Sequence, residues 1–314
     1  MATTTPGTQQ GFSVADLRGD AGRLRKEAAV RWAFMGAAVV SILISALIVY
    51  SLFENALTFA RAVELDQILS RGWFPRRGLY DIRTLIVGSL LVTAIAMVVA
   101  MPLGLGAAVY LSEYARPRVR KVLKPVLEIL AGVPSVVLGF FALTWIAPNI
   151  VAQLFEGSTQ FSLAAAGIGV GLLTIPLVAS VAEDALRSVP DSLREASYGM
   201  GARKITTTLK VVFPAAVSGL VAATIIAVSR AIGETLVVAI AAGGSGGSLF
   251  TTDITGPGQT MTAAMASLAA GTDRVVGADN TFESLFFVGM ILFLITVGLN
   301  LIADRFVRRV RQKY

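Results

Sequence analysis

Two charged residues, Arg230 and Glu234, interrupt an otherwise uncharged stretch over residues 211–252. A charge at the centre of a bilayer costs about 2.5 to 3.5 kcal/mol on insertion scales, so two of them in such a stretch need a reason. Residues four apart share a helix face, so we expect these side chains to lie together and partly neutralise each other. The pair is either a salt bridge that fixes helix packing or part of a polar path, in which the planar arginine fork receives an oxyanion.

Other kinds of reactive site are excluded by composition. The chain has no cysteine and no histidine, which removes disulfides, thiolate and imidazole metal sites and the commonest general base. The apolar stretches offer hydroxyls with no base nearby except Glu234, which we expect Arg230 to hold ionised. The glycine-rich runs 243–247 and 167–171 lack the sequence context of a phosphate-binding loop, and no G-x-x-x-x-G-K-[ST] occurs. We therefore expect this chain to bind no cofactor and no ATP. The small residues of 167–171 instead favour close helix contact.

The elements that must position these residues are membrane spans. Of 314 residues, 55% are hydrophobic and 15% charged, with a mean hydropathy of +0.72. An ordinary soluble domain has roughly 25% charged residues, and a helix needs about 20 apolar residues to cross a bilayer. The sufficiently long stretches are 33–52, 84–112, 129–155, 157–182, 211–252 and 284–303. The sequence predicts an all-α, polytopic membrane protein with six transmembrane helices.

Prolines and flanking segments set the expected boundaries. Pro102, Pro134 and Pro148 should each kink or end a helix, so we place the third helix at about 128–147 and an external loop at 148–160. The first uncharged run, of 20 residues, exceeds the 7 to 15 of a secretory signal, which indicates an uncleaved span. The expected organisation is a disordered cytoplasmic segment 1–31, a transmembrane domain 32–308 with a cytoplasmic loop at 183–214, and a cytoplasmic tail 309–314.

The distribution of basic residues predicts the orientation. With a cytoplasmic N-terminus, the inside segments hold 20 of the 27 Lys and Arg residues and the outside segments hold 6, so both termini are expected in the cytoplasm. This bias accounts for the net charge of +7 without nucleic acid, and basic residues at 116–124 are expected to meet anionic lipid headgroups. The external segment 53–83 carries charges of both signs and is either a solvated loop or a docking surface.

The loop 183–210 contains the most specific motif. A turn and N-cap at 190–192 precede a helix expected at 193–209, which contains Glu195-Ala196 and Gly201. After nine further residues comes the run 211–214, which ends in Pro214. This string resembles the EAA motif of ABC-importer permeases, with the spacing met in full. It departs from the motif at Ser197, Val211 and Phe213. The resemblance implies a type I, MetI-like permease fold and a coupling helix that sits in a cleft of a separate ATPase. An amphipathic helix on the membrane surface is the alternative.

A second resemblance narrows the family. The run 229–235 is similar to the S-R-A-x-G-E-T signature of phosphate-specific permeases of the Pst system, and 130–141 and 259–263 are similar to its third-helix motif and to its PstC member. The resemblance implies that Arg230 and Glu234 lie on a phosphate path, with Ser135 and Thr235 as weaker candidates to bind phosphate oxygens. Those two hydroxyls are alternatively bonded to a carbonyl one turn back.

The same resemblance implies partners and a location. These are a PstA-like second permease, two PstB-like ATPase subunits that hold ATP with Mg, and an extracytoplasmic PstS-like phosphate-binding protein, at the bacterial cytoplasmic (inner) membrane. The chain would then be a transport subunit and not itself an enzyme. The alternatives are an ABC permease for another anion or small solute, such as molybdate, sulfate or an amino acid, a channel, or an intramembrane enzyme.

Overall fold

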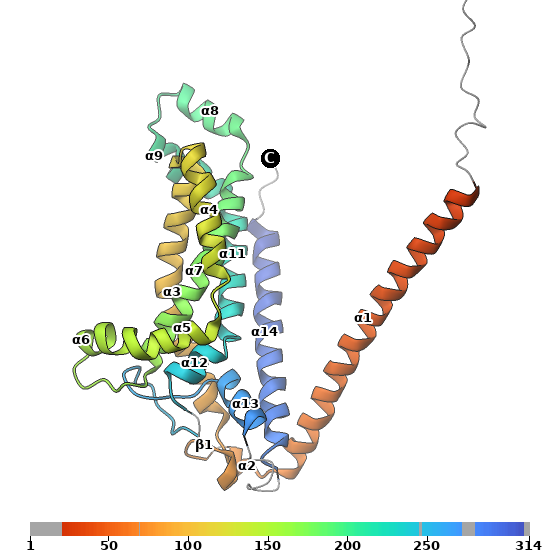
Figure 1. Cartoon of the computed structure of the whole chain (residues 1–314), viewed down its shortest axis with the longest axis vertical. Coiled ribbons are helices and arrows are strands. Elements are labelled where there is room, and N and C mark those ends of the chain that lie inside the picture. Colours follow the sequence, from red (N-terminus) through yellow and green to blue (C-terminus); the bar gives the residue numbers. More distant parts are fainter. Residues whose placement is uncertain (1–20, 69, 245–246, 272–279, 311–314) are drawn as a thin grey trace, which may run out of the picture. The chain divides into compact units, whose positions relative to one another are not determined.

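The computed structural model describes residues 21–68, 70–244, 247–271 and 280–310, and they are mostly helical (Figure 1). The helices are α1 (Ala21–Ala62), α2 (Leu65–Ile68), α3 (Ile82–Val109), α4 (Pro117–Ala131), α5 (Ser135–Phe141), α6 (Ala152–Leu154), α7 (Leu163–Arg187), α8 (Asp191–Gly199), α9 (Lys204–Thr207), α10 (Phe213–Ala215), α11 (Val217–Ile232), α12 (Leu236–Ala241), α13 (Met261–Ala270) and α14 (Glu283–Val310). The strands are β1 (Trp73–Phe74) and β2 (Leu79–Tyr80), joined by a 3-10 turn, η1 (Pro75–Arg77). Three π-helical turns are η2 (Tyr110–Tyr114), η3 (Ala142–Val151) and η4 (Thr208–Val212).

The chain divides into two units, Met1–Ser51 and Leu52–Tyr314. In the first unit, α1 begins at Ala21, eleven residues before the expected domain boundary, while the rest of the expected disordered segment, residues 1–20, lies outside the described residues. The side chains described up to Ser51 are almost all exposed, and most from Ala33 on are apolar. Such a surface suits lipid. At the other terminus, α14 continues to Val310, and residues 311–314 lie outside the described part.

The six spans expected from hydropathy correspond to five single helices and one bent helix pair. Five described helical stretches are long and apolar enough to cross a membrane: Arg25–Ala62, Ile82–Tyr114, Ser135–Leu154, Leu163–Arg187 and Glu283–Arg309. The pair Lys204–Ala215 and Val217–Ile232 makes a sixth span, bent by 71° at its break. Pro102 does not end its helix, because α3 continues through that residue to Val109.

Helix α7 is the most buried element of the second unit. It packs against α3, α11, α4 and α12. Its glycines allow the close approach to α3: a Cβ at Gly167 would lie 2.7 Å from the Cβ of Ile95, and one at Gly171 would lie 2.8 Å from that of Val99. The prediction that these small residues serve helix contact is therefore confirmed.

The third apolar stretch contains a break that shifts its helix along the chain. The expected helix at 128–147 is wrong: α4 ends at Ala131, and the span begins at Ser135 and runs to Leu154. Pro134 causes this shift because it lacks a backbone N–H, and it takes the extended conformation of an N-cap before α5. The expected loop at 148–160 is consequently shorter, since η3 and α6 carry the helix past Pro148.

The fifth apolar stretch is not one long span. It was expected to run to residue 252, but α11 ends at Ile232 and only the short α12 follows before the chain leaves the helix. The chain then folds over the start of α7. There the N–H groups of Leu163 and Ala164 donate to the carbonyls of Gly256 and Ile254, at 3.1 and 2.8 Å. These bonds satisfy donors that a helix N-terminus leaves unpaired.

The described residues of the segment 53–83, all except Leu69, fold into the end of α1, α2, β1, η1, β2 and the start of α3. After α1 ends, β1 and β2 pair antiparallel with Trp73 opposite Tyr80. Both side chains are buried, and Phe59 packs edge-on against Tyr80 at 4.9 Å between ring centroids. Asp81 then caps α3 by accepting from the Arg83 N–H at 3.1 Å. Aromatic burial of this kind holds the segment against the helices.

Candidate functional site

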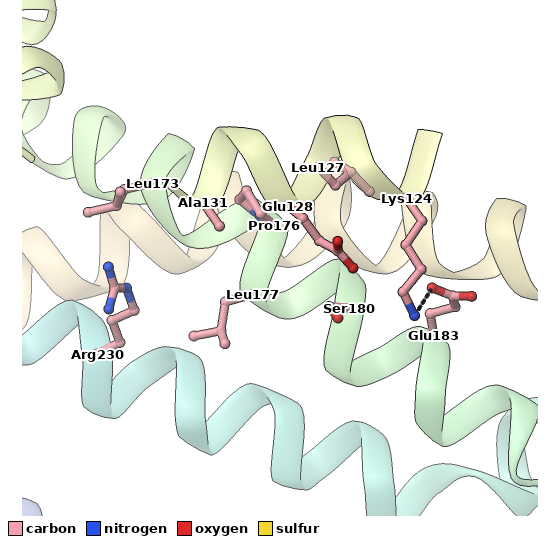
Figure 2. Close-up of a pocket in the computed structure, with 10 residues that line it drawn as sticks. All are labelled: Lys124, Leu127, Glu128, Ala131, Leu173, Pro176, Leu177, Ser180, Glu183 and Arg230. Atoms are coloured by element: carbon pink, nitrogen blue, oxygen red, sulfur yellow. Dashed lines mark ion pairs between the residues drawn. The ribbon is translucent and has the colours of Figure 1, made fainter. Parts of the chain in front are cut away.

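Arg230 lies in the last turn of α11 and faces a cavity of about 330 Å³ between α4, α7 and α11 (Figure 2). The other lining residues are Lys124, Leu127, Glu128 and Ala131 from α4, and Leu173, Pro176, Leu177, Ser180 and Glu183 from α7. No described residue forms an ion pair or a hydrogen bond with the Arg230 guanidinium. The arginine therefore brings a cation with free donors to a largely apolar cavity.

The end of the cavity away from Arg230 is closed by charged groups (Figure 2). Glu183 is fully buried and pairs with Arg120 and with Lys124, whose Nζ lies 3.4 Å from Oε2 of the carboxylate. A buried carboxylate needs such partners because burial removes its hydration. Partial burial lowers the pKa of Lys124, but the carboxylates of Glu183 and Asp184 raise it by more, so its pKa lies above the ordinary value. Lys124 is thus charged at physiological pH.

Glu234 does not share a helix face with Arg230, so that prediction is wrong. Helix α11 ends at Ile232, Gly233 caps it, and Glu234 follows in the connection to α12. Among the residues that the structure describes, the two side chains form no ion pair. The Glu234 backbone is nevertheless fixed, since its N–H donates to the Ala231 carbonyl and its carbonyl accepts from the Thr262 hydroxyl at 2.8 Å. The break leaves the two charges on separate elements.

The weaker candidates, Ser135 and Thr235, each lie where a helix begins. Ser135 is the first residue of α5, half-buried, and the described residues give its hydroxyl no hydrogen-bond partner. Thr235 precedes α12, and its hydroxyl donates to the Gly233 carbonyl at 3.3 Å. That bond is local, reaching two residues back, and so resembles the alternative role expected for a membrane hydroxyl. Helices α5 and α12 pack against each other, which puts both breaks in one region of the fold.

The loop 183–214 with the expected coupling motif, here named the coupling segment, has its helices α8 and α9 at one end of the helices of the second unit, opposite β1 and α2 (Figure 1). Glu195 and Ala196 are exposed on α8, and Pro214 is exposed in α10. The helix expected over 193–209 is two helices, because α8 ends at Gly199 and α9 begins at Lys204. Gly201 makes the turn between them with φ +77°, a left-handed conformation that favours glycine. The four motif residues are therefore spread over a helix, a turn and a second helix.

A family match covers most of the region just described. Residues 100–312 match the family described as binding-protein-dependent transport system inner membrane component. The chain belongs to this family. The match includes α4, α7, α8 and α11, which are the elements of the cavity and of the coupling segment. With its six spans, this permease is a multi-pass inner-membrane protein.

Curated relatives of the permease include several phosphate transport proteins. The probable ABC transporter permease protein YqgH of Bacillus subtilis is 38% identical over 57% of this chain, and the chain spans 58% of that protein's length. The phosphate transport system permease protein PstC 1 of Mycobacterium bovis is 31% identical, and the match covers 75% of each chain. PstC of Mesorhizobium japonicum is 28% identical over 87% of this chain and 88% of its own.

Solved structures show the same fold at low identity. An inward-facing structure of the MetNI methionine ABC transporter has a TM-score of 0.52 at 21% identity, over 74% of this chain and 94% of that chain. A bacterial alginate ABC transporter in complex with a periplasmic protein has a TM-score of 0.64 at 13% identity, over 93% and 99%. The expected ABC-importer type I permease fold is therefore confirmed.

Sequence reasoning did not find the residues that share the cavity with Arg230. Glu183 and Ser180 lie three apart on α7, and Pro176 and Leu173 continue the same face at helical spacing. That spacing was visible in the sequence. The contact of these residues with Lys124 could not be predicted, because the sequence does not show that α4 packs against α7.

Proposed function

We propose that this permease is a membrane subunit of a phosphate ABC importer, through which inorganic phosphate crosses the inner membrane. The free guanidinium of Arg230, facing a cavity between α4, α7 and α11, carries the proposal. The run 229–235, which contains Arg230, resembles the Pst signature. Relatives matched over most of the chain are named phosphate transport system permeases.

The chemistry of Arg230 suits a phosphate oxyanion. A guanidinium presents parallel N–H donors that match two phosphate oxygens, and it stays charged at any physiological pH. Hydrogen bonds to an ionised group are stronger where water is excluded. Glu234 would lie beside the path on the connection after α11, with the hydroxyls of Ser135 and Thr235 as further donors. A sulfate or molybdate importer would use the same fork, so substrate choice is the part of the proposal that needs a direct test.

The transport cycle would need partners that supply energy and substrate. Two PstB-like ATPase subunits would hydrolyse ATP with Mg and bind the segment with Glu195, Ala196, Gly201 and Pro214. A PstA-like permease would form the other half of the path, and a PstS-like protein would deliver phosphate. Basic residues favour a cytoplasmic location of α8 and of both termini. Alternating access would then rock the helices between outward and inward states.

ATP hydrolysis by the assembled complex tests the substrate. The complex is purified with its ATPase and binding protein, placed in proteoliposomes, and given phosphate or sulfate. We expect phosphate with the binding protein to stimulate hydrolysis, and sulfate to leave it at the basal rate. Equal stimulation by both anions, or stimulation by sulfate alone, would overturn the phosphate assignment and leave the permease family intact.

A further inference from the structure

Arg194, one residue before the expected coupling motif, connects α8 with the ends of α7 and of η2. It belongs to α8, and its side chain is 14% exposed, unlike those of its neighbours Glu195 and Ala196. Its guanidinium points away from the exposed face of α8 and toward the ends of α7 and α3, as the following contacts show. A long cationic side chain that is buried in a connecting segment needs a set of partners.

Two of these partners are carbonyls, one in the last turn of α7 and one just after its end. Nη2 donates to the Leu186 carbonyl at 2.8 Å, and Nη1 donates to the Val189 carbonyl at 2.6 Å. The last carbonyls of a helix have no partner within the helix and carry the negative end of its dipole. Arg194 therefore caps α7 from α8 and spans the turn between them.

The other two partners are carboxylates with different exposure. Nη2 pairs with Oε1 of Glu113 at 3.0 Å, and that side chain is 3% exposed. Nη1 pairs with Oδ1 of Asp191 at 3.1 Å, and that side chain is 88% exposed. The exposed pair contributes little because solvent screens it, so the buried Glu113 is the partner that matters. Glu113 lies in η2, the π-helical turn that continues α3.

We propose that Arg194 is a positioning residue that fixes α8 to the ends of α3 and α7, so that a displacement of α8 moves this helix pair as one body. The inference rests on the proposed function, in which a partner ATPase moves α8. Helices α3 and α7 pack closely along their length, and α7 lines the cavity that Arg230 faces. The Arg194 guanidinium therefore adds a direct polar link between α8 and the two helices, beside the short connection to α7 and the packing of Leu193 against the ends of α3 and α7.

The test compares variants of Arg194 in the full complex in proteoliposomes. Arg194→Gln removes the charge and the fork, Arg194→Lys keeps the charge alone, and Arg118→Gln removes an exposed cation of α4 as a matched control. We expect Arg194→Gln to keep the ATPase bound and its basal hydrolysis intact. Phosphate moved per ATP should fall about tenfold, within the range that coupling between sites spans. Arg194→Lys should lie between, and Arg118→Gln should match the unmodified complex.

A distance measurement tests the positioning without transport. The chain has no cysteine, so Leu103→Cys on α3 and Ser192→Cys on α8 place spin labels at two exposed positions. The distance distribution between the labels should broaden with Arg194→Gln and keep its width with Arg118→Gln. An unchanged distribution together with an unchanged ratio of phosphate to ATP would overturn the proposal. Loss of ATPase binding in Arg194→Gln would also overturn it, since Arg194 would then act at the docking surface.

A variant of the partner residue Glu113 keeps the test decisive if the Arg194→Gln chain does not fold. Glu113→Gln keeps the shape of the side chain and removes the charge, so a smaller fall in the same ratio is expected. The double variant should cost less than the sum of the two single effects, because both act on one contact. Independent, additive effects would contradict the contact. An unmodified complex that hydrolyses ATP but moves no phosphate would refute the proposed function alone, since the label distances would still decide the role of Arg194.

Discussion

The hydroxyl of Thr262 donates a hydrogen bond to the backbone carbonyl of Glu234, with 2.8 Å between the two oxygens. This bond ties the start of α13 to the connection that follows α11, although the two residues are 28 positions apart. The carbonyl belongs to a break in a membrane helix, where backbone groups have no water to replace a lost partner. The bond therefore helps to hold the break next to Arg230 in one conformation.

Replacing Thr262 tests this bond. Thr262→Val keeps the shape of the side chain and leaves the Glu234 carbonyl without this donor, which should cost about 1 to 3 kcal/mol. We expect phosphate uptake by Thr262→Val to fall several-fold, and Thr262→Ser, which retains the hydroxyl, to restore most of it. Uptake rates in cells expressing equal amounts of each variant provide the measurement. Equal rates for Val and unmodified protein would contradict a role for the bond.

The turn at Gly201 gives a second test, with a matched glycine two residues earlier. A Cβ would meet no atom within 4 Å at either Gly201 or Gly199, but only Gly201 has a left-handed φ, of +77°. Alanine in that conformation costs roughly 1 to 2 kcal/mol. Gly201→Ala should therefore reduce co-purification of the ATPase, and Gly199→Ala should leave it unchanged. A similar loss in both variants would mean that the added methyl clashes with the partner and that the backbone conformation is not the cause.

Close packing between α3 and α7 predicts opposite effects at two glycines of α3. A Cβ at Gly104 would lie 2.6 Å from the Cβ of Val178 on α7, whereas one at Gly106 would meet nothing within 4 Å. Gly104→Ala should destabilise the protein by about 1 to 3 kcal/mol through overpacking. Gly106→Ala should be neutral or stabilising by up to about 1 kcal/mol, because alanine favours the helix. Thermal unfolding in detergent measures both, and a lower midpoint for Gly106→Ala than for Gly104→Ala would contradict the packing.

The spans were predictable from the sequence because each must present about 20 apolar residues to lipid. The breaks within them were less so. Pro134 marked a break, but apolar residues flank it on both sides. Hydropathy therefore did not show that the span begins after the proline, at Ser135, and runs to Leu154. Gly233 is a residue type that often ends a helix, but the expected helix ran through it, so Arg230 and Glu234 were placed on one face. Beyond the break, α12 packs against α5, and hydropathy does not record such packing.

In the coupling segment, too, some features could be predicted from the sequence and others could not. The motif singled out Gly201, but the helix expected over 193–209 ran through this residue, whose left-handed conformation separates α8 from α9. Arg194 stood beside the motif but gave no signal, because its decisive partner, Glu113, lies 81 positions earlier. Contacts of that separation depend on the tertiary fold.

The central claim is that Arg230 contacts phosphate on its way across the membrane. Its most direct test is uptake of labelled phosphate at low external concentration by cells with the unmodified chain, with Arg230→Ala or with Arg230→Lys, using labelled sulfate as the control. We predict that Arg230→Ala abolishes phosphate uptake while the complex still assembles, and that Arg230→Lys retains a small part of it because charge remains but the planar fork is lost. Sulfate uptake should not change. Normal phosphate uptake by an assembled Arg230→Ala complex would contradict the account.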